Sequence, residues 1–141
     1  MTRTLRKRLC FLEIRFFSMV VPFIARLFSF EGMLKIVEPR RPWRGPGLPT
    51  VEEIAVYVDR ILGRRLLMRR QLCLRRSLVL YRFLRKLGLD VQINFGVAPP
   101  GRSGRLKAHA WLSQKGKPFL ESGETHEGFD LIHTYCGKET G

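Results

Sequence analysis

The chain has 141 residues, of which 45% are hydrophobic, and this composition suits one hydrophobic core in a single domain. Its formal net charge of +14 attracts polyanions, but its basic clusters contain no zinc finger, RNA-recognition aromatic motif or nucleotide-binding loop. We therefore expect no nucleic-acid partner and no cofactor, and we interpret the basic clusters as solvated faces or partner-docking surfaces.

The cysteines bear on the cellular compartment. Cys10, Cys73 and Cys136 are widely spaced and odd in number, which excludes a complete disulfide framework and the paired spacing of a zinc or redox motif. This usage fits a reducing cytoplasm, the localisation that we expect. His126, His133 and Cys136 lie in a glycine-rich tail without paired ligand spacing, so we expect no metal site.

The N-terminal segment, residues 9–30, is rich in large apolar residues and follows a basic beginning. Glu13, Arg15 and Arg26 leave only ten consecutive uncharged residues, whereas a membrane-spanning helix needs about twenty. We expect an amphipathic or buried helix that Pro22 kinks or breaks. Contact with a membrane surface is a less favoured alternative, because Phe and Leu beside Arg and Lys also describe an interfacial helix.

A connector and a helix come next in the chain. Residues 38–49 contain four prolines and two glycines, which sustain neither a helix nor a central strand. Thr50 is a good helix N-cap with Glu53 at the capping-box position, and the apolar residues after it have helical spacing. We predict a helix over Val51–Leu62 that packs beside the following one.

A second helix is predicted from Cys73 to a glycine C-cap at Gly88. Cys73 lies on the apolar side with Leu80 and Leu84, and the basic residues lie on the other side. If the helix begins at Cys73, its unpaired amides and the positive end of its dipole favour a thiolate and an oxyanion there. A nucleophile at the rim of a core and an ordinary buried cysteine both fit this pattern.

After Gly88 the periodicity changes to two, which predicts a strand over Val91–Val97 and another over 106–112. In the second strand His109 lies on the face opposite to the small apolar residues. A hairpin turn at Gln114–Lys117 leads to Pro118–Glu121, which would bring Glu121 near His109. The order of cysteine on a helix, histidine on a strand and acid on the next strand fits a catalytic triad. Ordinary polar roles for His109 and Glu121 are the alternatives.

Three segments of the sequence, Cys73–Gly88, Val91–Val97 and His109-Ala-Trp111, resemble the transglutaminase-like leader peptidases of lasso-peptide biosynthesis. The resemblance covers roughly Val51–Glu121. It implies a papain- or transglutaminase-like α+β fold in which N-terminal helices precede a small antiparallel sheet. We accordingly divide the single domain 1–141 into an N-terminal helix and connector (1–48), a catalytic core (49–122) and a C-terminal tail (123–141).

The resemblance also implies the chemistry: hydrolysis of the peptide bond between leader and core in a ribosomally synthesised precursor. Cys73 would be the nucleophile and His109 would carry the proton. Glu121 occupies about the place where that family has aspartate, so Glu124 and Asp130 are alternatives for the third residue.

Partners follow from the same resemblance. Such peptidases act with a separate leader-recognition protein, and an ATP-dependent lasso cyclase closes the ring of the released core. By analogy with papain-like proteases, Gln71 is a candidate for the oxyanion hole. Two other functions stay open: a transglutaminase-like acyl transferase that uses the same residues, and a non-catalytic basic module that binds peptides.

Overall fold

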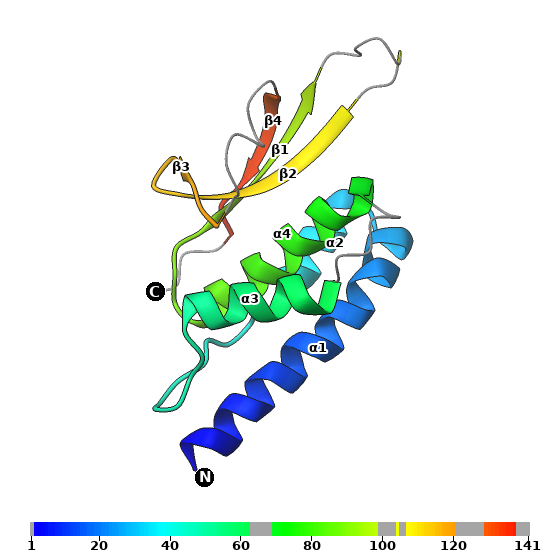
Figure 1. Cartoon of the computed structure of the whole chain (residues 1–141). Helices are drawn as coiled ribbons and strands as arrows, with labels where there is room; N and C mark the ends of the chain where they lie inside the picture. Colours follow the sequence, from blue (N-terminus) through cyan, green and yellow to red (C-terminus); the bar gives the residue numbers. More distant parts are fainter. Residues whose placement is uncertain (1, 63–68, 99–103, 105–106, 121–128, 138–141) are drawn as a thin grey trace.

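The computed structural model of the chain describes residues 2–62, 69–98, 104, 107–120 and 129–137. Within these residues, helices precede a small antiparallel sheet with the strand order β3-β2-β1-β4 (Figure 1). The expected α+β arrangement is confirmed. The elements are α1 (Arg3–Leu27), α2 (Phe30–Val37), α3 (Val51–Leu62), α4 (Arg69–Lys86), β1 (Gln92–Ala98), β2 (Lys107–Gln114), β3 (Lys117–Pro118) and β4 (Asp130–Tyr135).

The N-terminal segment forms two helices, α1 and α2, and the break between them does not lie at the proline. Helix α1 continues through Pro22 to Leu27, so Pro22 does not break it, and of the expected kink or break only the kink stays a prediction. The helix tolerates the lost backbone donor because the turns before and after it pack on the core. Ser29 starts α2 and accepts a hydrogen bond from the Gly32 amide at 3.2 Å. No described helix is long and apolar enough to cross a bilayer.

The proline-rich connector between α2 and α3 contains no helix or strand, as predicted. Trp43 fixes it to α4, because its amide donates to the Lys86 carbonyl at 2.7 Å and its ring stacks on Phe83 with centroids 5.5 Å apart. The capping box of α3 is confirmed. The Thr50 amide donates to the Glu53 carboxylate at 2.9 Å, and the Glu53 amide donates to Thr50 Oγ1 at 3.2 Å.

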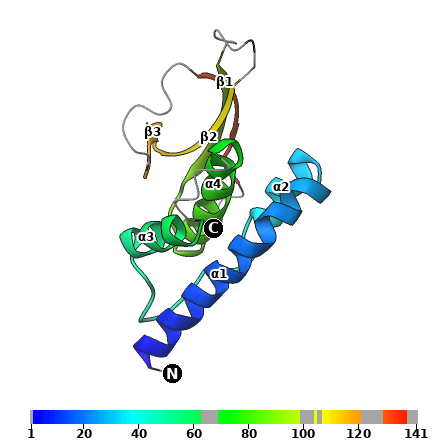
Figure 2. The same ribbon diagram turned by 45° about the vertical axis from the view of Figure 1, so that its right-hand side comes forward.

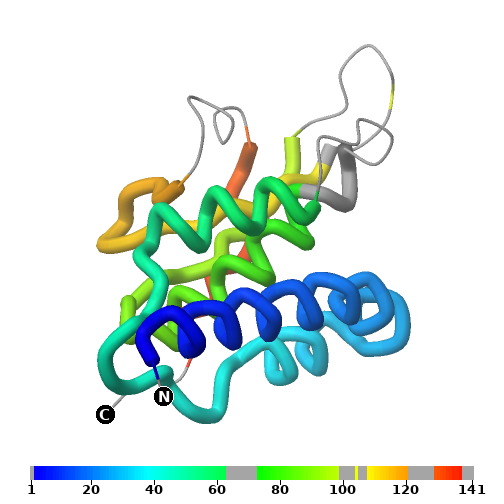
Figure 3. The backbone as a smooth tube through the Cα atoms, turned by 60° about the horizontal axis from the view of Figure 1, so that its bottom comes forward, coloured from blue at the N-terminus to red at the C-terminus, as the bar shows by residue number. Residues whose placement is uncertain are grey.

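Helix α4 is the centre of the fold. Four consecutive residues, Leu78, Val79, Leu80 and Tyr81, have no exposed surface. A helix reaches this state only when neighbouring elements cover all of its sides. Helices α1, α2 and α3 and strands β1 and β2 all contact α4. Figure 3 shows α4 between α1 and α3, and Figure 2 shows the sheet on one side of α4 and α2 on the other.

The basic side of α4 is also covered, which corrects the solvated face expected for this cluster. Arg85 is only 2% exposed and forms an ion pair with Glu38 at 3.2 Å between Nη2 and Oε1. The Tyr81 hydroxyl donates a hydrogen bond to the same carboxylate. Lys86 pairs with Glu13 of α1. Arg85 and Lys86 are therefore paired with acids from the end of α2 and from α1, and these ion pairs hold both elements to α4.

The β1–β2 ladder fixes which side chains share a face of the sheet. It pairs Ile93 with Leu112 and Gly96 with His109. Ile93 and Leu112 belong to the core around α4. Because side chains alternate along a strand, His109 and Trp111 lie on the opposite face, as the sequence predicts.

The hairpin after β2 is confirmed, but its second strand is shorter than expected. Lys115 and Gly116 both have positive φ, 52° and 78°, as in a two-residue hairpin turn. Strand β3 comprises only Lys117–Pro118, and Leu120 with φ of 57° has left the extended conformation. Strand β4, Asp130–Tyr135, lies in the segment that we interpreted as a tail and pairs with β1 on the side away from β2.

Candidate active site

A pocket of about 340 Å³ lies between α2, the first half of α4 and strands β1, β2 and β4. Cys73 of α4 and His109 of β2 both line it, together with His133 of β4. The other residues of its lining are apolar or glycine. The structure thus brings the two residues that the sequence singles out to the lining of one largely apolar pocket, while strand alternation places the His109 imidazole on the sheet face opposite α4. A largely apolar pocket with a few polar groups is the usual form of a small-molecule or peptide subsite.

Cys73 lies one turn inside α4, not at its first residue. The described helix begins at Arg69, so the expected start at Cys73 is wrong. The residues between them are good helix formers, which extend the helix backwards. The unpaired amides of the helix therefore precede Cys73, and the positive end of the dipole lies about 6 Å away along the axis. The thiol itself is half-buried, and the role expected for Gln71 stays a prediction.

His109 is packed among aromatic rings on the sheet. Its imidazole stacks on Trp111 with centroids 5.7 Å apart and an interplanar angle of 17°, and it contacts Phe129 at 5.1 Å. The Nε2 atom is buried. A Cβ atom at Gly96, the cross-strand neighbour, would lie 2.8 Å from the Trp111 ring. Glycine at position 96 therefore leaves the space that this ring occupies beside His109.

The pocket has an aromatic wall that the sequence did not indicate. Phe30 at the start of α2 contacts Phe95 of β1 at 4.7 Å and His133 of β4 at 5.6 Å between ring centroids. Phe95 and His133 are cross-strand partners, so both lie on the sheet face that packs on α4. The sequence of β4 has no apolar alternation that could have marked this strand, and the contact with Phe30 depends on tertiary structure alone. His133 thus places an imidazole on the α4 side of the sheet, within the lining of the pocket.

The third residue of the expected triad is not established by the described part of the chain. Glu121 and Glu124 lie outside the described residues. Asp130 begins β4, where it is exposed and pairs with Val97 of β1. It lies at the same end of the sheet as His109, because Gly96 next to Val97 is the partner of His109.

His126, His133 and Cys136 are the residues of the C-terminal segment that could ligate a metal. His126 lies outside the described residues. Among those that the structure describes, no group of three His, Cys, Asp or Glu side chains is arranged to hold a metal ion. His133 instead forms part of the wall of the Cys73 pocket.

The other two cysteines occupy different environments. Cys10 is buried in α1, and burial, aided by the nearby Glu13 carboxylate, raises the pKa of its thiol. It therefore stays protonated and closed to substrates at neutral pH. Cys136 is exposed just after β4. Neither lines the pocket that holds His109.

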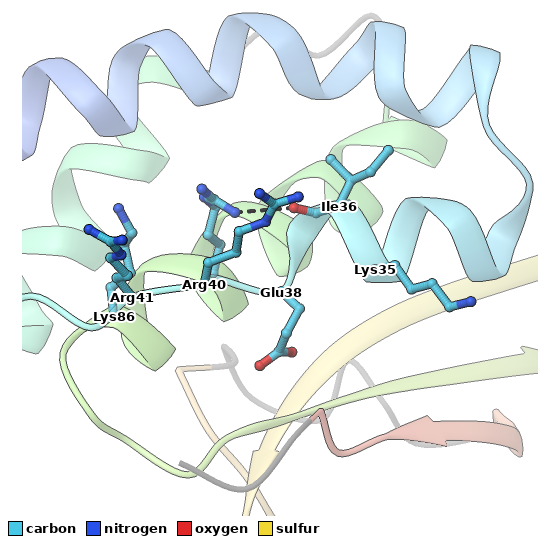
Figure 4. A pocket seen from close by; sticks show the side chains of 7 residues that line it. Lys35, Ile36, Glu38, Arg40, Arg41 and Lys86 are labelled. Atoms are coloured by element: carbon cyan, nitrogen blue, oxygen red, sulfur yellow. Dashed lines mark hydrogen bonds between the residues drawn. The ribbon is translucent and has the colours of Figure 1, made fainter. Parts of the chain in front are cut away.

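A second pocket, of about 640 Å³, is lined mainly by cations (Figure 4). Two of them are engaged within the fold: Lys86 pairs with Glu13, and Arg82 donates to the Ile36 carbonyl at 3.1 Å, drawn as a dashed line in Figure 4. Its charge suits an anion, but its lining contains neither a thiol nor an imidazole. Its lining residues are Lys35, Ile36, Glu38, Arg40, Arg41, Arg82 and Lys86.

Comparison with known proteins agrees with the fold. Searches against curated proteins and against solved structures gave no match. The sequence matches the profile of the transglutaminase-like superfamily over residues 17–134, which includes all of α2, α3 and α4, strands β1 to β3 and most of β4. This superfamily includes cysteine peptidases and acyltransferases. The chain therefore belongs to the transglutaminase-like superfamily.

Proposed function

We propose that the protein is a cysteine peptidase that removes the leader from a ribosomally synthesised lasso-peptide precursor. The observation that carries the proposal is the shared pocket of Cys73 and His109 in a chain of the transglutaminase-like superfamily. The extended resemblance of the Cys73 helix and the His-Ala-Trp motif to leader peptidases supports the choice of substrate.

The chemistry follows the thiol–imidazole mechanism. His109 accepts the proton of the Cys73 thiol, and the sulfur attacks the carbonyl carbon of the bond between leader and core. Collapse of the tetrahedral intermediate breaks the C–N bond, and His109 gives its proton to the leaving amine. Water then hydrolyses the thioester, which releases the leader acid and the thiol. A carboxylate that orients His109, with Glu121 as first choice, stabilises the imidazolium form.

His133 makes this assignment testable within the pocket, because its imidazole lies on the sheet face that packs on α4, whereas that of His109 lies on the opposite face. If His109 is the base, His109→Gln should lower the rate of cleavage by a factor of about 10² or more. His133→Gln should then change the rate far less, since its ring serves as a wall. The reverse result would transfer the role of the base to His133.

We further propose that a separate leader-recognition protein delivers the precursor and that an ATP-dependent cyclase acts on the core. A bound leader is held near the thiol, so a bimolecular encounter becomes a local one. The isolated protein should therefore cleave slowly, and the recognition protein should raise the rate.

The test is incubation with the precursor encoded beside the gene, with and without the recognition protein, followed by mass spectrometry. Hydrolysis gives two fragments whose masses sum to that of the precursor plus one water. An acyl transferase, the second activity found in this superfamily, would give a leader fragment that carries an added amine. Binding of the precursor without cleavage, unchanged in the Cys73 and His109 variants, would favour a non-catalytic module.

A further inference from the structure

The outer face of α1 carries a continuous apolar stripe. Seven large side chains lie on it, and each is between 46% and 77% exposed. At about 100° per residue they fall within an arc of about 80°, and they extend over about 33 Å of helix. The opposite face of α1 packs on the core. The residues of the stripe are Leu5, Leu9, Leu12, Phe16, Met19, Phe23 and Leu27.

Exposed cations follow one side of this stripe. Arg8, Arg15 and Arg26 are exposed, and all three lie about 60–80° from the middle of the stripe. On the other side of the stripe, the acidic residue Glu13 forms an ion pair with Lys86 and accepts a hydrogen bond from the Trp43 indole. Its negative charge is therefore neutralised within the fold. The exposed face of α1 is therefore apolar and cationic, and an occupant needs apolar groups beside negative charge.

The apolar surface extends beyond one helix. Phe28 in the break after α1 and Phe30 at the start of α2 are 49% and 44% exposed. A partner helix would cover the narrow stripe of α1 but would not follow the chain around this corner. A second copy of the protein would bring a charge of +14 against an equal charge. The fluid surface of an anionic membrane can cover the apolar stripe together with Phe28 and Phe30. Its negative charge can at the same time pair with the exposed arginines beside the stripe.

We propose that α1 docks the protein on the surface of a bilayer that contains anionic lipids. The helix lies in the plane of the interface, with the stripe among the acyl chains and the arginines at the headgroups. Phe30, which also forms the wall of the Cys73 pocket, then holds that pocket next to the membrane. The docking is independent of the proposed peptidase activity, since it uses no residue of the thiol–imidazole pair.

The experiment is sedimentation of the full chain with vesicles of phosphatidylglycerol and phosphatidylcholine in equal parts, and with phosphatidylcholine alone. Phe16→Ser/Phe23→Ser should weaken partitioning to the anionic vesicles by at least about tenfold. Val56→Ser, which removes a side chain 57% exposed on α3, is the control and should bind like the wild type. The substituted side chains are exposed, so unchanged thermal unfolding will show that each variant is folded.

Charge is tested by a matched pair of double variants. Arg8→Gln/Arg15→Gln should lower binding to anionic vesicles several-fold more than Lys115→Gln/Lys117→Gln, which removes two exposed charges from the β2–β3 turn. Equal losses in both would show non-specific attraction by net charge and would overturn the proposal. Absence of vesicle binding would also overturn it, as would dimerisation in solution that disappears in the Phe16→Ser/Phe23→Ser variant.

Discussion

The ion pair between Glu38 and Arg85 gives a quantitative prediction for Glu38→Gln. The Arg85 side chain is 1% exposed and that of Glu38 is 13% exposed, so water cannot replace the carboxylate. Removal of one member of a buried pair costs roughly 3–5 kcal/mol. The introduced amide keeps an acceptor for the Tyr81 hydroxyl, and Arg85 keeps its 3.5 Å contact with Asp90. We therefore expect the free energy of unfolding to fall by about 2–3 kcal/mol.

Urea unfolding followed by circular dichroism measures this change, which should lower Tm by about 6–12 °C in a chain of this size. Asp59→Asn is the control, because Asp59 pairs with Arg76 at 2.7 Å but is 52% exposed. It should cost less than about 1 kcal/mol. Glu38→Gln/Arg85→Met should recover part of the loss, because it removes the buried charge. Equal effects of Glu38→Gln and Asp59→Asn would refute the reasoning that this pair holds α2 to α4.

Three further predictions concern the site and its supports. Glu121→Gln should strongly lower turnover in the cleavage assay while Asp130→Asn does not; the opposite pattern in folded variants would assign the triad acid to Asp130. Burial and the Glu38 carboxylate raise the pKa of Tyr81. The folded protein therefore keeps the proton of the Tyr81 hydroxyl to a higher pH than the unfolded chain does. The contribution of Tyr81 to the free energy of unfolding is present below a pH of about 10 and falls above it. In urea unfolding curves taken at increasing pH, Tyr81→Phe should make the decrease in this free energy above a pH of about 10 less steep. Gly96→Ala should cost about 1–3 kcal/mol in urea unfolding, since its Cβ would lie 2.8 Å from the Trp111 ring; an unchanged free energy would show that the ring moves freely.

Local sequence signals predicted the elements that carry the site. The Thr50 capping box, the turn at Lys115-Gly116 and the alternation around His109 all act between residues close in the chain, and all are confirmed. Cys73 and His109 line one pocket, and their role as a catalytic pair stays a prediction.

Other features depend on contacts between distant segments. The basic side of α4 resembled a solvated face because its acidic partners lie far away in the chain: Arg85 and Glu38 are separated by 47 residues, and Lys86 and Glu13 by 73. Strand β4 was missed because it is short and gains its order by pairing with β1. The wall formed by Phe30 and His133 joins residues from opposite ends of the sequence, so no local pattern indicates it.

The most direct test of the central claim is the cleavage of the precursor by Cys73→Ala, compared with the wild type and with Cys136→Ser. The alanine removes the sulfur that we propose as the nucleophile but little volume from a half-buried site, so the fold and the binding of partners should persist. Cys136 is exposed and lies outside the pocket, so its variant should cleave at the rate of the wild type. Mass spectrometry should detect both fragments for the wild type and Cys136→Ser, and intact precursor alone for Cys73→Ala. Cleavage by Cys73→Ala at the rate of the wild type would contradict the proposed mechanism.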